Sequence, residues 1–128
     1  MNIAILCTVV LGLLLFALGL NVSITRKRHA KGIGHDLRPD DPVHRAVRAH
    51  GNTAEYAPFL AALFLWYAAH GAPVWVNVTI IIATLARLLI AAGLLWGGPL
   101  NQANPLRAIG ALFTYLAGLV LTASLLVA

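Results

Sequence analysis

Four long apolar stretches, separated by short polar connections, run along the chain. A bilayer core about 30 Å thick is crossed by a helix of roughly 20 apolar residues, so each stretch has the length of a membrane span. The pattern therefore predicts one all-α domain over residues 1–128, an integral membrane four-helix bundle. We expect its helices at about residues 3–26, 43–70, 74–96 and 105–127.

Residues of the turn-forming types mark the connections between these helices. Residues 27–42 contain two glycines, two prolines and mixed charges, which is typical of a loop. Asp40 or Asp41 is available to cap the second helix. The stretch His70-Gly71-Ala72-Pro73 predicts a tight turn, and Gly97-Gly98-Pro99 predicts the end of the third helix.

Basic residues gather around the first connection. Seven of the nine Lys and Arg residues lie between Arg26 and Arg48. Positively charged loops stay in the cytoplasm, so the loop 27–42 is expected there and both termini on the outer, periplasmic side. The first stretch opens without positive charge and ends in a basic cluster, unlike a signal peptide, which favours a retained anchor. For a bacterial source, this arrangement predicts the inner (plasma) membrane.

Composition supports lipid as the main surrounding of the chain. Of its 128 residues 60% are hydrophobic and 10% are charged, and the mean hydropathy is +0.84. The net charge of +5 could suggest nucleic acid, but it belongs to one loop and its borders, and no nucleic-acid module is recognisable, so no nucleic-acid partner is expected. Cys7 has no disulfide partner within the chain, and the five histidines show no paired ligand spacing, so no metal site is expected.

Two charged residues stand deep inside the expected spans. Glu55 lies sixteen residues before Gly71, and Arg87 lies sixteen residues after it. In an antiparallel helical hairpin the two side chains would share one depth, which predicts an ion pair between them. Such a pair could simply lock the two helices together, and it could also belong to a functional site.

The second helix also carries a polar stripe. Arg48, Asn52 and Glu55 stand at positions i, i+4 and i+7, which places them on one helix face, and Arg45 extends the stripe towards the cytoplasm. A guanidinium, an amide and a carboxylate in this order could hold a zwitterionic ligand. The alternative is that Arg45 and Arg48 are interfacial basic residues that only set the topology.

The run from Arg45 to Pro58, which reads RAVRAHGNTAEYAP, resembles the second helix of the MAPEG family, the membrane-associated proteins of eicosanoid and glutathione metabolism. The resemblance covers essentially the whole chain and is strongest to small bacterial members. Arg87 and Arg107 fall where the family has arginines in its third and fourth helices.

The resemblance implies a homotrimer that binds glutathione between neighbouring subunits near the cytoplasmic face and acts on lipophilic substrates. It implies that Arg87 orients Glu55, and that Arg107, with Arg26 or Arg28, assists formation of the glutathione thiolate. Its expected ligand contacts on the second helix are Arg48, Asn52, Glu55 and Tyr56, with Arg45 beside them.

The expected function is therefore that of a membrane-bound glutathione-dependent transferase or peroxidase, acting on lipophilic electrophiles or lipid hydroperoxides. A non-catalytic MAPEG-like binding or scaffold protein is the alternative, because Ile90 and Leu94 stand in the third helix where relatives often carry a His and a Tyr. A small multidrug exporter would also have four spans, but such exporters need an acid in the first helix, and residues 3–26 contain none.

Overall fold

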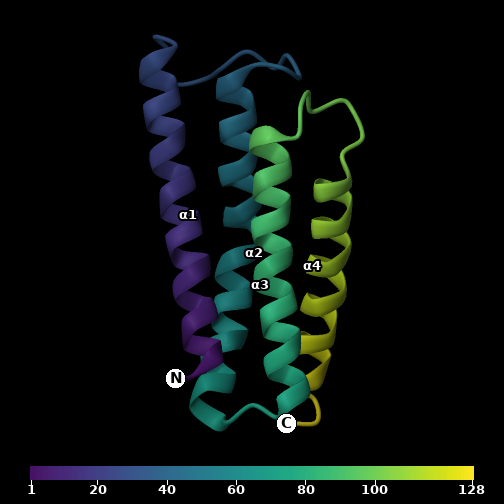
Figure 1. The fold of residues 1–128 in the computed structure, drawn as a ribbon. Coiled ribbons are helices and arrows are strands. Elements are labelled where there is room, and N and C mark those ends of the chain that lie inside the picture. The colour runs from purple at the N-terminus through teal and green to yellow at the C-terminus, as the bar shows by residue number, and fades with distance from the viewer.

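The computed structural model describes all 128 residues and contains four helices that run antiparallel in one bundle (Figure 1). The chain termini lie at one end of this bundle, and the α1–α2 loop and the α3–α4 link lie at the other, which we call the basic end (Figure 1). The predicted all-α four-helix architecture is confirmed. The helices are α1 (Ile3–Arg28), α2 (Pro42–His70), α3 (Val74–Trp96) and α4 (Pro105–Ser124).

Three of the helices, α1, α3 and α4, are long and apolar enough to cross a membrane. The helix α2 is longer, with 29 residues, but its first third is polar. Because α2 runs alongside its neighbours through the length of the bundle (Figure 1), it crosses the same layer. Its polar first turns then stand at the basic end, ahead of the apolar part of the helix.

Three helix boundaries differ from the predicted ones, and the smallest difference is the start of α2, at Pro42 instead of residue 43. The helix α1 continues to Arg28, because basic side chains in a last turn are stabilised by the partial negative charge of the helix C-terminus. The predicted end of the fourth helix at residue 127 is wrong, since α4 ends at Ser124. Beyond that residue the backbone amides bond to carbonyls three positions back, as in a tightened final turn: Leu125 to Thr122, Leu126 to Ala123 and Val127 to Ser124.

Side-chain caps begin three of the helices, and at the start of α1 the Oδ1 of Asn2 accepts from the amides of Ala4 and Ile5. Asp41, rather than Asp40, caps α2, because its Oδ2 accepts a hydrogen bond of 2.8 Å from the amide of His44. Asn104 caps α4, and its Oδ1 accepts from the amides of Leu106 at 2.9 Å and Arg107 at 3.2 Å. The Nδ2 of Asn104 also donates to the carbonyl of Gly97, at 3.0 Å, so this one side chain joins the end of α3 to the start of α4.

Replacing Asn104 with alanine is expected to lower the free energy of unfolding by about 1–2 kcal/mol, since the start of α4 loses its cap and Gly97 loses a donor. Thermal unfolding of the purified protein in detergent, followed by circular dichroism, measures the change. Asn101→Ala is the matched control, because Asn101 is exposed in the same link. Equal melting temperatures for the two variants would contradict the capping role.

Buried apolar side chains form two clusters along the bundle. The larger one includes Phe64 and Ile80 towards the end with the termini, and the smaller one includes Ala49 and Ile90 towards the basic end. Between the two clusters, α2 and α3 contribute polar side chains, the largest of which is the fully buried Arg87. This polar layer is where the fold positions a candidate site.

Candidate functional site

Arg87 of α3 is the centre of the polar layer. Its side chain is 0% exposed, and its Nη2 donates a hydrogen bond of 2.5 Å to Oδ1 of Asn52 on α2. Its Cζ also lies 5.0 Å from the centre of the Tyr56 ring, within the range of a cation–π contact. Arg87, Asn52 and Tyr56 are therefore one packed group, and one of them, Asn52, comes from the stripe that the sequence predicted on the second helix.

The predicted ion pair between Glu55 and Arg87 is wrong. No Arg87 nitrogen lies within 4.0 Å of Glu55, and the carboxylate is instead 3.9 Å from Nη1 of Arg48 on its own helix. The two residues do share a similar depth, but Glu55 faces outwards, with 55% of its side chain exposed. Asn52 occupies the side of α2 that faces α3, so Arg87 orients the amide of Asn52 and not the carboxylate of Glu55.

Two donors of the buried guanidinium have no partner. The Nε and Nη1 atoms of Arg87 are buried and make no hydrogen bond. A charged group in this position is costly unless it is paired, since burial removes it from water and no carboxylate compensates it. The site is therefore electropositive at its base and complementary to an anionic or strongly polar group.

The outer part of the stripe is open. The side chain of Arg48 is 46% exposed and pairs loosely with Glu55, so both can exchange this contact for a ligand. Arg45 stands seven residues before Asn52 and also contacts α3. Its Nη2 donates a 2.8 Å hydrogen bond to the carbonyl of Leu95, in the last turn of α3, where it neutralises the helix terminus.

The two arginines that the resemblance assigns to thiolate formation bind backbone carbonyls at the basic end. Nη1 of Arg26 donates to Gly32 O at 2.7 Å and Gly34 O at 2.5 Å, both in the α1–α2 loop. Arg107 donates in the same way to two carbonyls of the α3–α4 link, those of Leu100 and Gln102. Within this single chain, the structure therefore brings neither arginine to the stripe on α2.

A cavity of about 430 Å³ lies beside the polar layer, between α2 and α4. It begins at Glu55 and Tyr56 and continues along apolar surface, and in its wall the hydroxyl of Tyr56 donates a long hydrogen bond of 3.5 Å to that of Tyr115. The threonine hydroxyls in its wall already donate to carbonyls of their own helix. The cavity therefore suits an apolar molecule. Its lining consists of Glu55, Tyr56, Phe59, Leu60, Thr114, Tyr115, Gly118, Leu119 and Thr122.

Sequence reasoning missed the contribution of α4 to this cavity. Thr114, Gly118 and Thr122 stand four residues apart, which puts small and hydroxyl side chains on one face of an otherwise apolar helix. That spacing could have indicated a lining face. Tyr115 follows Thr114 directly, and no pattern in the sequence points to its contact with Tyr56.

These features define a multi-pass integral membrane protein with a buried cationic layer beside an apolar cavity. The chain matches the model of the MAPEG family over residues 4–127, which is nearly its whole length, and it belongs to this family. The predicted family is thereby confirmed, and with it the link to a family of membrane glutathione-related transferases and peroxidases. Comparison with the curated proteins and with the solved structures gave no match.

Proposed function

We propose that the protein is a membrane-bound glutathione-dependent transferase or peroxidase that acts on lipophilic electrophiles or lipid hydroperoxides. The observation that carries this proposal is the buried guanidinium of Arg87, which has unpartnered donors and holds Asn52 on the same helix as the open pair of Arg48 and Glu55. The family supplies the class of ligand, and the adjoining apolar cavity supplies room for the second substrate.

The side chains on α2 fit the chemistry of glutathione. The tripeptide offers carboxylates, peptide groups and an ammonium group, all of which are strongly polar. Arg48 is suited to a carboxylate, which a guanidinium binds through two parallel hydrogen bonds, and Glu55 is suited to the ammonium group. Asn52, held by Arg87, presents its remaining amide donors to a peptide carbonyl.

The residues of the basic end would promote the reaction. Bound glutathione supplies a thiol as the nucleophile. Arg107, with Arg26, would lower the pKa of that thiol, because a nearby guanidinium stabilises a thiolate in a poorly hydrated site. In a homotrimer these arginines could reach the ligand from a neighbouring subunit. The cavity between α2 and α4 would hold the lipophilic substrate, which partitions into it from the bilayer, so that catalysis depends mainly on positioning.

Glutathione binding tests the proposal directly. Isothermal titration of the purified protein in detergent is expected to show binding that weakens roughly tenfold to a hundredfold in Arg48→Ala and Glu55→Ala, as the loss of a charged hydrogen bond predicts. Lys31→Ala, which removes an exposed loop charge, serves as the control and should bind like the parent. Absence of binding by the parent protein, or equal affinities in all four proteins, would contradict the proposal.

A second candidate is a non-catalytic binding or scaffold protein with the same architecture. The observation in its favour is that Ile90 and Leu94 are buried apolar residues, so α3 offers a ligand no polar group beyond Arg87 in this region. This candidate predicts intact trimers and no thiol chemistry with a broad panel of electrophiles. Turnover that depends on Arg107 would exclude it.

A further inference from the structure

Two histidines join the α1–α2 loop to the start of α2. The ring of His35 stacks on that of His44, with centroids 5.0 Å apart and planes 24° apart. Nε2 of His35 and Nδ1 of His44 lie 2.9 Å apart, which is a hydrogen bond between the two rings. Such a bond needs at least one neutral ring, because two imidazolium groups have donors only.

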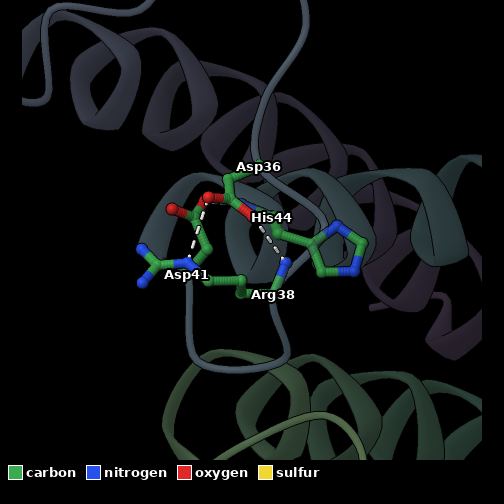
Figure 2. Close-up of polar contacts among 4 residues, drawn as sticks. All are labelled: Asp36, Arg38, Asp41 and His44. Atoms are coloured by element: carbon green, nitrogen blue, oxygen red, sulfur yellow. Dashed lines mark hydrogen bonds and ion pairs between the residues drawn. The ribbon is translucent and has the colours of Figure 1, made fainter.

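The same loop is fastened at other points across the basic end. We call residues 29–41 the strap. Arg26 donates to its carbonyls from α1, and the carbonyl of Pro39 accepts a 2.9 Å hydrogen bond from the amide of Leu100 in the α3–α4 link. Figure 2 shows Asp36, Arg38, Asp41 and His44 gathered where the strap meets α2. The strap therefore ties α1, α2 and the α3–α4 link together over one end of the bundle.

The position of the protons on the two rings follows from their surroundings. Nδ1 of His35 is buried and has no partner, so a proton there would be a buried donor without an acceptor. The ring of His35 is thus best accommodated with its single proton on Nε2, donated to Nδ1 of His44. Protonating either ring disturbs this arrangement, because it creates an unpaired donor on His35 or places two donors face to face.

We propose that His35 and His44 form a proton-sensitive latch, which holds the strap closed over the basic end at neutral pH and releases it when the rings become protonated. Release would withdraw the strap carbonyls from Arg26 and free its guanidinium. The release itself stands on the histidine geometry alone, whereas the consequence for Arg26 in catalysis rests on the function proposed above.

The charges around His44 support this behaviour. Burial, His35 and Arg48 lower the pKa of His44 below its usual value of 6.5, and Asp41 and Asp36 only partly oppose them. The backbone amide and the guanidinium of Arg38 hold the pKa of Asp36 below its usual value, so this carboxylate stays ionised as His44 becomes protonated.

The sign of the pH dependence follows. The closed strap binds fewer protons than the open one, so closure is fully favoured above about pH 6.5 and is lost as the pH falls below it. For each additional proton bound on opening, the equilibrium between open and closed strap shifts by at most about tenfold per pH unit.

A spin label on the strap measures the latch without any ligand. Leu37 is 73% exposed in the strap, and Cys7 is the single cysteine, so Leu37→Cys in a Cys7→Ser background gives one labelling site. Electron paramagnetic resonance of the labelled protein in lipid nanodiscs is recorded from pH 7.5 to pH 5. We expect the mobile fraction to increase as the pH falls below about 6.5.

Two variants and one control make the test specific. In His35→Gln the label should remain immobile over the whole range, since an amide can donate to a neutral His44 and accept from a protonated one. In His44→Gln the response should be reduced but not lost, because protonation of His35 still places a donor at its buried Nδ1. His29→Gln, at the exposed start of the strap, should respond like the parent. No pH response in the parent, or an unchanged response in both Gln variants, would overturn the latch. Glutathione titration of the same samples tests the proposed function separately.

Discussion

Replacing Gly110 with alanine is expected to lower the free energy of unfolding by about 1–3 kcal/mol, the usual range for overpacking. A Cβ atom at this position would lie 2.8 Å from the carbonyl oxygen of Ala86 and 2.8 Å from the amide nitrogen of Ile90. Both atoms belong to the backbone of α3, so no side chain can rotate away, and α3 and α4 would have to separate. The loss should appear although alanine forms helices better than glycine by about 1 kcal/mol.

The same helix provides the control. Gly118 has open space where its Cβ would lie, so Gly118→Ala should keep or slightly increase the stability of the protein. Reversible unfolding by detergent titration compares the two variants with the parent. If Gly110→Ala proved as stable as Gly118→Ala, the close approach of α3 and α4 would be refuted. Ala86 and Ile90 flank Arg87 on α3, so this approach also fixes the segment that carries the buried guanidinium.

The fold was predictable because it depends on local features of the chain. Runs of apolar residues, a proline after an aspartate and glycine-rich breaks each act within a few positions, and together they gave the number and nearly all the bounds of the helices. The end of α4 was missed because Leu125 to Val127 are as apolar as the helix before them. Only the backbone hydrogen bonds, which change to the i→i−3 type there, mark the boundary.

The partners of the arginines were less predictable, and the reason is geometric. Counting residues from Gly71 gives depth in the membrane, but it does not give the rotation of α2 about its axis. That rotation decides that Asn52, and not Glu55, meets Arg87. Arg26, Arg45 and Arg107 bind backbone carbonyls, which every residue carries and no sequence pattern distinguishes.

The histidine pair escaped prediction for a related reason. His35 and His44 are nine residues apart and meet only because the strap folds back on α2. Their spacing does not match paired ligands on one helix face, so the sequence pattern gives no sign that the two rings meet. The MAPEG resemblance, in contrast, rests on a contiguous run in α2, and recognising it does not require the rotation of the helices. The family model confirms it over residues 4–127.

Replacing the buried Arg87 with an apolar residue is expected to keep or increase the free energy of unfolding and to weaken glutathione binding. Replacing its partner Asn52 serves as the comparison. Asn52→Ala removes the one hydrogen-bond acceptor of the guanidinium, and it is expected to lower the free energy of unfolding by about 1.5–3 kcal/mol. Arg87→Met keeps the length of the side chain but removes the charge. Because apolar replacement of a poorly compensated buried charge is neutral or stabilising, this variant should be as stable as the parent or up to about 4 kcal/mol more stable.

The comparison of the two variants separates a structural arginine from a binding one. With Arg87→Met already present, Asn52→Ala should cost less than it does in the parent, since no guanidinium is left without a partner, and detergent unfolding of the double variant measures this coupling. Glutathione titration should nevertheless show that Arg87→Met has lost affinity, because Asn52 no longer has a fixed orientation and the base of the site is no longer cationic. An arginine that served packing alone would give the reverse: a less stable protein, with unchanged affinity in the fraction that remains folded. Loss of stability without loss of affinity would therefore remove Arg87 from the site.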